Sequence, residues 1–559
     1  MKLCIFISLK KIKIIPVFFS ENAFTLQSHL IMTNKIYMPT FCTNFLNRRV
    51  LFLLLAGFTT IYAHAQKEPG LDITNQSNEQ QILYNEDSIL HTAWKPIVYT
   101  DTGIYASWGS WFHRKFFQEH LLQLNHPAFK LNADIIFDEY IGNSKRQITT
   151  PEMNTRGFEV SGTVGKNFYF ETNFYENQGR FGGYIDSFIR QNFIIPGQGG
   201  FKNKGDGKGF DFASSDAKLV YKPGKIFMFD LGYGKNFIGD GYRSILLSDW
   251  SFNYPYFRTA VNLGKFQYNV MWSQYISDRD RIYNNKQGYF RKWAQTFYVD
   301  WKPIDQLNIG IFESVMWPDQ DSSRNKDMSP WIASPIMFAH GSESPDGVKN
   351  NEIYGANVKL RILKSTHLYG QFAFQHSKTG SSSINSYAVQ GGIRSGNTFG
   401  VENLNTLLEF NMATPYMYAT NSPNTNYEHN NQPLAHALGA NFMEGLFKAD
   451  YLYKRFSVRL EAFYAKYGAD SNATLNYGHN IYKPISTASV AGNGEILQGL
   501  KTNILFADLK LAYILNPVTN MRIEAGATFR NEKSKTFFYK DRIFYIGIRM
   551  SFRKISYDY

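Results

Sequence analysis

Apolar and polar residues alternate along many short segments of the chain. In 542–552 Phe544, Ile546, Ile548, Met550 and Phe552 share one face, and the other face carries Tyr545, Gly547, Arg549 and Ser551. The same period of two recurs in 521–529, where Met521, Ile523 and Phe529 share the apolar face, and in 458–464, 354–362 and 266–272. Because successive side chains of a strand point to opposite faces, each segment is predicted to be a β-strand with one apolar face.

The connections between these segments are of two kinds. Short turns rich in Gly, Pro, Asn and Lys occur at 165–167, 222–225, 264–265, 302–305, 363–366, 454–455 and 516–519. Long polar connections occupy about 177–211, 235–256, 318–351, 414–445 and 467–503. Strands of soluble proteins also show alternating apolar and polar residues, but long structureless loops are uncommon in compact soluble domains. Short turns alternating with long loops are typical of outer-membrane barrels, in which the short turns are periplasmic and the long loops extracellular.

The predicted fold is therefore all-β, a closed antiparallel transmembrane β-barrel of about 18 strands. The predicted strands are 131–140, 157–165, 167–176, 212–221, 226–234, 257–264, 266–275, 293–302, 306–316, 352–362, 366–376, 386–395, 403–413, 446–454, 456–466, 504–515, 519–529 and 541–552. An even count returns both ends of the barrel to the periplasm, and closure removes the exposed sheet edges. Four tryptophans near strand ends are candidates for interfacial girdles: Trp272, Trp293, Trp301 and Trp317.

The N-terminal part is predicted to be a presequence over 1–65, with the true start at Met32 or Met38. Basic residues (Lys35, Arg48, Arg49) precede the apolar run 50–61, which is too short to span a bilayer as a helix. Ala63-His64-Ala65 then fits a signal-peptidase site, so the mature chain is expected to begin at Gln66. Residues 66–128 are predicted to be a periplasmic linker and helical segment. The helical spacing over 111–124 suits a periplasmic helix or a lumen plug, or equally an element packed against the barrel mouth with no separate role. The barrel is expected over 129–559.

Composition fits an exported barrel. The chain has 559 residues, with 47 Phe, 36 Tyr and 9 Trp, an aromatic content that suits a wall between lipid and water. Both cysteines, Cys4 and Cys42, precede the expected cleavage site, so the mature chain has no disulfide and no cysteine metal site. Residues 1–65 hold seven of the 59 Lys and Arg and one of the 46 Asp and Glu, which leaves a mild net charge of +7. Neither this charge nor export favours nucleic-acid binding.

Familiar catalytic and metal motifs are incomplete. The glycine-rich run 205–209 has Gly209 where a phosphate-binding loop needs Ser or Thr. The run 319–323 starts like a calcium loop, but Arg324 follows in place of Gly. His429 and His436 are interpreted as surface residues of a loop rather than a metal pair. No catalytic residue, no metal site and no cofactor is predicted, and the chain is expected not to be an enzyme.

Eight charged residues fall by parity on the face opposite the lipid: Arg361, Arg459, Glu461, Asp508, Lys510, Arg522, Glu524 and Arg549. They are expected to face the lumen. Two interpretations are open. The residues form ion pairs that brace the wall, or they line a selective conduit.

The densest group of charged and aromatic residues is 232–256, GYGKNFIGDGYRSILLSDWSFNYPY. Five of its residues are candidates for ligand binding: Asp240, Tyr242, Arg243, Asp249 and Trp250. Aromatic rings contact the apolar face of a sugar, and carboxylate and guanidinium groups bond its hydroxyls or a uronate. The alternative is a loop folded into the barrel that only holds its own shape, with Gly239 and Gly241 allowing a tight bend.

This segment also carries a family resemblance. NFIGDGYRSILLSD followed by NYPYFR resembles the outer-membrane capsule-assembly proteins of the Wzi type, in the RemB-like form of gliding Bacteroidota. Similar stretches are 111–122, 193–197, 212–221 and 387–394, so the resemblance covers about 90–552. It implies an 18-stranded barrel of the Gram-negative outer membrane with periplasmic helical elements. It also implies a non-enzymatic, lectin-like role in holding or organising polysaccharide.

Two functional hypotheses follow. The chain binds or organises capsule or exopolysaccharide at the cell surface, with a link to gliding motility, or it is a porin for small solutes. The expected neighbours are outer-membrane lipid and lipopolysaccharide, a surface polysaccharide, and proteins of polysaccharide export or gliding.

Overall fold

The computed structural model describes residues 91–97, 108–144, 150–205, 207–277, 290–318, 320–321, 324–325, 333–340, 350–379, 382–489, 494–551 and 553–559. The predicted presequence and cleavage site lie outside the described residues. Among the residues described, no helix is long and apolar enough to cross a membrane.

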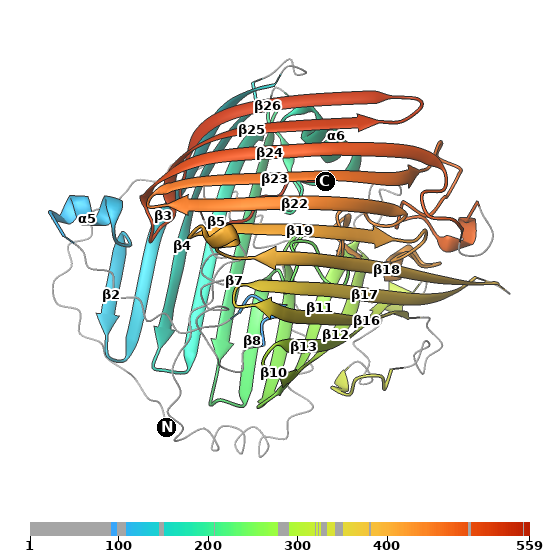
Figure 1. Cartoon of the computed structure of the whole chain (residues 1–559), viewed down its shortest axis with the longest axis horizontal. Coiled ribbons are helices and arrows are strands. Elements are labelled where there is room, and N and C mark those ends of the chain that lie inside the picture. Colours follow the sequence, from blue (N-terminus) through green and yellow to red (C-terminus); the bar gives the residue numbers. More distant parts are fainter. Residues whose placement is uncertain are drawn as a thin grey trace. The chain divides into compact units, whose positions relative to one another are not determined.

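Eighteen long antiparallel strands form a closed barrel, in which each strand pairs with the next and the last pairs with the first (Figure 1). The strands are β3 (Phe129–Ser144), β4 (Glu152–Val164), β5 (Phe168–Arg180), β7 (Phe210–Tyr221), β8 (Phe227–Gly234), β10 (Tyr254–Leu263), β11 (Phe266–Ser277), β12 (Phe290–Ile304), β13 (Leu307–Pro318), β16 (Asn351–Leu363), β17 (Thr366–Thr379), β18 (Ser382–Ser395), β19 (Leu404–Ala413), β22 (Phe442–Tyr453), β23 (Phe456–Ala469), β24 (Leu500–Asn516), β25 (Met521–Lys533) and β26 (Phe538–Arg549). The predicted fold class and strand number are confirmed.

Local sequence explains the tight connections between strands. Gly165, between β4 and β5, and Gly264, between β10 and β11, have φ angles of 62° and 65°. L-residues with a side chain rarely adopt such angles, so glycine permits these short turns.

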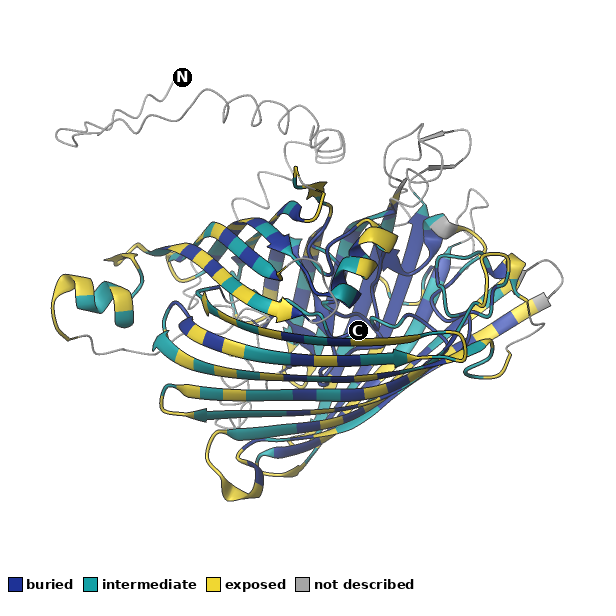
Figure 2. Ribbon diagram, turned by 90° about the horizontal axis from the view of Figure 1, so that it is seen from above, coloured by how far each residue is buried: buried dark blue, intermediate teal, exposed yellow. Residues whose placement is uncertain are grey.

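The wall has an apolar outer face. On β26, Phe544, Ile546 and Ile548 are exposed, whereas on β25 Arg522 and Glu524 are buried. Figure 2 shows the resulting alternation of exposed and buried residues along the strands. Met521, expected on the outer face, is instead buried at the register shift where β24 leads into β25. An apolar outer band is the surface that outer-membrane barrels present to lipid.

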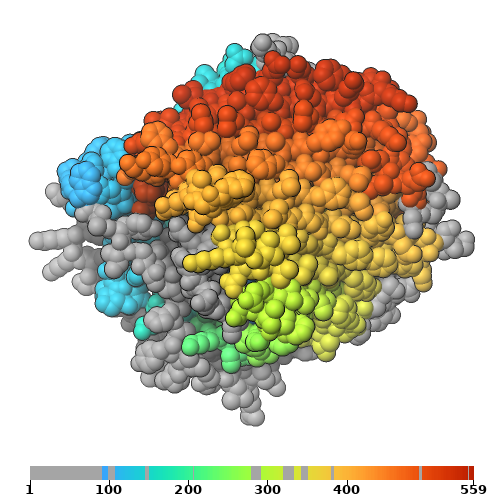
Figure 3. Space-filling view, viewed as in Figure 1, coloured from blue at the N-terminus to red at the C-terminus, as the bar shows by residue number. Residues whose placement is uncertain are grey.

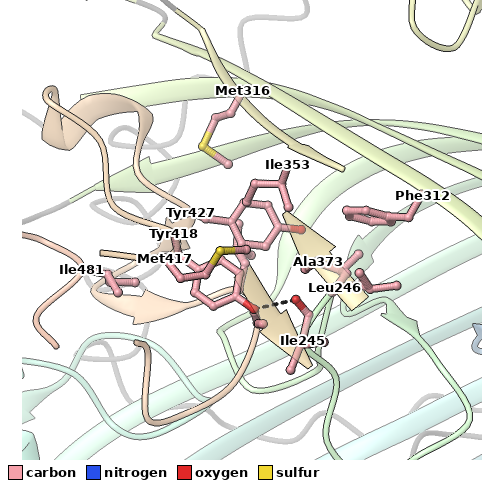
Figure 4. Close-up of a cluster of buried hydrophobic side chains, with 14 of the residues drawn as sticks. Ile245, Leu246, Phe312, Met316, Ile353, Ala373, Met417, Tyr418, Tyr427 and Ile481 are labelled. Atoms are coloured by element: carbon pink, nitrogen blue, oxygen red, sulfur yellow. Dashed lines mark hydrogen bonds between the residues drawn. The ribbon is translucent and has the colours of Figure 1, made fainter. Parts of the chain in front are cut away.

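The lumen is filled by segments of the chain itself. Residues 91–97 lie inside the barrel, where β1 (Trp94–Lys95) pairs with β9 (Phe237–Ile238) of the β8–β10 connection. The connection between β19 and β22 adds β20 (Glu428–His429) and β21 (Gln432–Pro433). Figure 4 shows Met417, Tyr418 and Tyr427 of that connection packed with Leu246 and with wall residues. The Tyr418 hydroxyl donates to the Ile245 carbonyl oxygen at 2.6 Å, which joins the two inserted connections.

The predicted helix over 111–124 is shorter than expected. Helix α5 (Trp111–Phe117) begins after Ser110, whose hydroxyl accepts from the His113 amide, and β2 (Leu122–His126) follows and pairs with β3. Residues 122–126 alternate Leu, Gln, Leu, Asn and His, a period of two that favours a strand.

One long connection covers part of the outer wall. Residues 333–340 pack over the outward residues of β12 and β13, where the Gln295 side chain donates to the Ser334 carbonyl at 2.7 Å. The Phe338 amide donates to the Glu313 carboxylate at 2.7 Å, and Glu313 is fully buried. Trp317, expected in an interfacial girdle, is buried here against Val315, with Trp272 and Trp293 packed beside it. Trp301 remains exposed and stacks on Phe266.

Candidate functional site

The block Gly239–Asp249 lies in the lumen against the barrel wall. The Ile245 amide donates to the Gln371 side chain of β17 at 3.0 Å, and the Ser244 hydroxyl donates to the Ile238 carbonyl at 2.6 Å. A Cβ at Gly241 would lie 2.2 Å from a carboxylate oxygen of Glu409 on β19. Glycine at this position therefore allows the block to approach the wall closely.

Arg243 is the centre of a buried charge cluster. Its guanidinium donates to the Asp558 carboxylate at 2.7 Å and to the Glu444 carboxylate at 3.2 Å. The backbone amides of Tyr242 and Arg243 donate to the two oxygens of Glu409 at 2.8 and 3.1 Å. Although burial opposes ionisation, the Arg243 guanidinium holds the pKa of Asp558 below its usual value. The cluster therefore fixes the block to two wall strands and to the C-terminal segment.

The other candidate residues are also engaged within the chain. The Asp240 carboxylate pairs with Lys359 at 3.2 Å and accepts from Asn357 at 3.0 Å. Asp249 pairs with Lys554 at 2.8 Å. Burial opposes the ionisation of Asp240, but the Lys359 ammonium group more than offsets it and lowers the pKa of that carboxyl.

The aromatic candidates contact the C-terminal segment directly. The Tyr242 hydroxyl donates to the Asp558 carboxylate at 2.8 Å, and the Trp250 ring lies 5.3 Å from the ring of Tyr559 in an edge-to-face contact. The ammonium groups of Lys448 and Lys554 lie over the Tyr242 ring at 3.5 and 4.8 Å. Four of the five candidates, Tyr242, Arg243, Asp249 and Trp250, contact residues 553–559, whereas Asp240 is bound to Lys359 and Asn357 of β16.

A small cavity remains beside this cluster. It is lined by residues of the block, of the β19–β22 connection and of the C-terminal segment, among them Arg243, Trp250, His436 and Lys554. About 20 Å³ of it is open to the centre of a water molecule, which is room for one or two waters. Within the part of the chain that is described, Arg243 Nε and Trp250 Nε1 are buried without a hydrogen-bond partner. The cavity can therefore accept an oxygen atom but not a whole sugar ring.

His436 is held by the same cluster. Its ring lies 2.8 Å from a carboxylate oxygen of Glu444 and is stacked on Phe442. Burial lowers its pKa, although Glu444 acts in the opposite direction. His429, the other histidine of this connection, is buried too, with Nε2 3.0 Å from the Asn253 carbonyl. The structure thus corrects the expectation that these two histidines are surface residues.

Most of the eight charged residues expected in the lumen form short ion pairs along the wall. The pairs are Lys448–Glu461 at 3.2 Å, Arg459–Asp450 at 3.1 Å, Lys510–Asp508 at 3.0 Å, Arg522–Glu524 at 2.9 Å and Arg549–Glu524 at 3.7 Å. Arg361 lies half-buried on β16. Pairing between neighbouring positions is the arrangement that a bracing role requires.

The C-terminal segment was missed as part of the site. The strand prediction extended to residue 552, but β26 ends at Arg549 and the chain then enters the lumen. The Arg553 guanidinium donates to Asn177, Gln198 and Ser214 at 3.0–3.2 Å. The sequence signal for this change is the composition of residues 553–559, RKISYDY. Basic, acidic and aromatic residues follow one another there, and the apolar–polar alternation of the strand ends.

Across the described ranges, no group of three or more His, Cys, Asp and Glu side chains is placed to hold a metal ion.

Comparison with known proteins gave matches among solved structures only. No protein-family model and no curated protein matches the sequence. Wzi of Escherichia coli, an outer-membrane protein involved in group 1 capsule assembly and described as a carbohydrate-binding β-barrel, is 16% identical with a TM-score of 0.46, over 74% of this chain and 84% of that chain. OprD of Pseudomonas aeruginosa is 8% identical with a TM-score of 0.40, over 75% and 94%. OpdK of the same organism, solved with vanillate, is 9% identical with a TM-score of 0.40, over 75% and 97%. Membership of the capsule-assembly family stays a prediction from the sequence motifs.

Proposed function

We propose that this protein is a non-enzymatic barrel of the outer membrane that binds or organises capsular or exported polysaccharide at the cell surface. A signal peptide cleaved before Gln66 directs it across the inner membrane. Its partners are lipopolysaccharide, a surface glycan, and proteins of polysaccharide export or gliding motility.

The observation that carries the proposal is the filled lumen. Residues 91–97, the connections β8–β10 and β19–β22, and residues 553–559 all occupy it with buried side chains. A general diffusion porin needs a continuous water path, so this packing favours binding over conduction. The sequence resemblance at GDGYRSILLSD supports a glycan as the bound molecule.

The cavity beside Trp250 suggests how a glycan is contacted. Its two unpartnered N–H groups, on Arg243 and Trp250, suit an oxygen atom of a sugar hydroxyl or uronate carboxylate. Because the cavity admits only such an atom, the sugar ring itself would stay outside it, next to lining residues such as Lys554. Asp240, Tyr242, Arg243, Asp249 and Trp250 are the proposed ligand-binding group, acting from within the plug.

The test combines conductance with glycan retention. The purified chain in a planar bilayer is expected to show no stable open-channel current and to be retained on an acidic polysaccharide column. Open conductance without retention would favour the porin hypothesis instead.

Two variants locate the site. Trp250→Phe removes the unpartnered N–H and keeps an aromatic ring against Tyr559, so it is expected to weaken retention without lowering stability. Trp301→Phe, on the lipid-facing side, is the matched control and should change neither. Arg243→Ala is expected to weaken glycan binding by the folded fraction by roughly ten- to a hundredfold. Unchanged affinity in both site variants would assign the block a bracing role only.

A further inference from the structure

An exposed aromatic face lies at and just before helix α5. Trp108, Trp111 and Phe112 are 70%, 61% and 67% exposed, and Phe116 is exposed beside them. The rings of Phe112 and Phe116 stack at 5.7 Å, so the exposed side chains form one surface. In Figure 3 this segment, coloured blue, projects at the edge of the barrel wall. Large exposed apolar patches of this kind mark contact with a membrane or another molecule.

The helix is fixed at the end of the barrel that carries the short β24–β25 turn, the end expected to be periplasmic. The side chain of Asn516, at the short β24–β25 turn, donates to the carbonyl oxygens of Lys115 and Glu119 at 3.4 and 3.1 Å. Arg114 and Lys115 both pair with Glu119, at 3.1 and 2.9 Å. The cations of the helix are thus partly neutralised within it, which lowers the cost of placing it near hydrocarbon.

β2 follows α5 and adds an apolar face at the edge of the barrel wall. The register of β2 with β3 places Leu122 opposite Ala133 and Leu124 opposite Leu131. Opposite residues of a sheet share a face, and on β3 this is the face of the exposed Ile135. Gln123 and Asn125 lie on the other face of β2.

The same outward face extends across the neighbouring strands. Phe129 on β3, Phe158 and Val164 on β4 and Phe168 on β5 are all exposed. The lumen side of β3 carries the buried residues Asp134, Ile136 and Asp138. The outward face of β2 is therefore continuous with the outward face of β3, β4 and β5, and α5 precedes β2 directly in the chain. The link between them is held to the wall by the Leu121 amide, which donates to the Asp134 carboxylate at 2.7 Å.

We propose that residues 108–126 form an interfacial anchor, with Trp108, Trp111, Phe112 and Phe116 inserted among the phospholipids of the periplasmic leaflet. Aromatic side chains are most stable at the level of the lipid headgroups, where their apolar faces leave water and their polar edges stay hydrated. The partner is a phospholipid surface, because the four aromatic side chains are exposed and α5 is joined directly to β2, whose leucines extend the outward apolar face of β3. Its strand β2 pairs with residues 129–133 of β3, on the part of that strand that β26 leaves unpaired, since β26 pairs only with residues 139–144.

Site-specific fluorescent probes test this placement. In a full chain with Cys4→Ser and Cys42→Ser, the substitutions Phe112→Cys, Gln123→Cys and Ile135→Cys each receive an environment-sensitive dye. The labelled proteins are reconstituted in phospholipid vesicles with and without brominated acyl chains. The probe at position 112 is expected to be quenched by brominated lipid to an extent approaching that at position 135. The probe at 123, on the polar face of β2, should respond instead to aqueous iodide.

Other outcomes would overturn the anchor. Strong iodide quenching at position 112 would place the helix in water. Protection from both quenchers would indicate that a second copy or another protein covers it. The tryptophans of the parent chain give a check without labels, because Trp108→Phe with Trp111→Phe should remove a component quenched by brominated lipid. If the labelled variant misfolds, this comparison still decides the proposal.

Discussion

The guanidinium of Arg243 and the carboxylate of Asp558 form a buried ion pair with an Nη1···Oδ2 distance of 2.7 Å, although 315 residues separate them along the chain. The pair joins the β8–β10 connection to the C-terminal segment inside the lumen, and Glu444 on β22 completes it. Inserted segments and wall are therefore expected to unfold together.

Arg243→Ala is expected to destabilise the barrel by about 3–5 kcal/mol, because it leaves the carboxylates of Asp558 and Glu444 buried without their cation. Denaturant unfolding in detergent, followed by the heat-modifiable mobility of the folded barrel, measures the loss. Arg459→Ala, which breaks the more exposed pair with Asp450, is the matched control and should cost about 0–1 kcal/mol. Equal losses in the two variants would contradict the central role of Arg243.

The loss of stability caused by a charged side chain on the outer face should depend on its position along the strand. Ile546→Arg places a cation towards the membrane midplane and is expected to cost about 2–4 kcal/mol, whereas Phe538→Arg, on the same face at the outer end of β26, should cost about 0–1 kcal/mol. Unfolding in lipid vesicles compares the free energies of unfolding of the two variants.

Gly547, on the opposite face of β26, is expected to tolerate no side chain, because a Cβ there would lie 2.2 Å from the Glu139 carbonyl oxygen. Tolerance of Gly547→Ala would show that the register of β26 with β3 is wrong.

The segment 333–340 should depend on Glu313 for its place on the outer wall. Glu313→Ala removes the acceptor of the Phe338 amide, so the connection is expected to become more sensitive to added protease. Glu313→Gln keeps an acceptor oxygen and should preserve resistance. Proteolysis of the two variants in intact cells, with cleavage sites mapped by mass spectrometry, makes the comparison. Similar cleavage of both would indicate that the other contacts of the segment hold it, such as the Gln295–Ser334 hydrogen bond and the ring contacts of His340.

Lys235 should make stability depend on alkaline pH. Burial lowers the pKa of this lumen residue from 10.5 to about 8, although Asp249 acts in the opposite direction. Below about pH 8 the folded state carries the full cost of a buried ammonium group, and this cost disappears as the pH rises towards 10.5, the unfolded value. The parent chain should therefore gain stability relative to Lys235→Met between pH 7 and 10. A stability difference between the parent chain and Lys235→Met that does not change with pH would contradict the lowered pKa of Lys235.

The strands, their number and most of their outward residues could be predicted from the sequence. Alternation in segments such as 542–548 is a local property, because backbone geometry alone places every second side chain on one face. Short turns with Gly165 or Gly264 equally carry their own signal. The end of β26 and the strand β2 were less predictable, because apolar residues near a strand end fit a strand, a helix or a turn by local pattern alone.

The contents of the lumen were decided only by the tertiary structure. The sequence by itself determined that Asp240, Tyr242, Arg243, Asp249 and Trp250 are close together, since they lie within 11 residues of one another. It did not determine that Glu409, Glu444 and Asp558 are the partners of Arg243, because those contacts join positions 166 to 315 residues apart. Closure of the barrel places residues from distant strands around one lumen. The partner of a buried charge then depends on which chain segments enter that lumen. The local sequence pattern fixes the direction of a side chain along a strand, whereas its partner across the lumen depends on the closed fold.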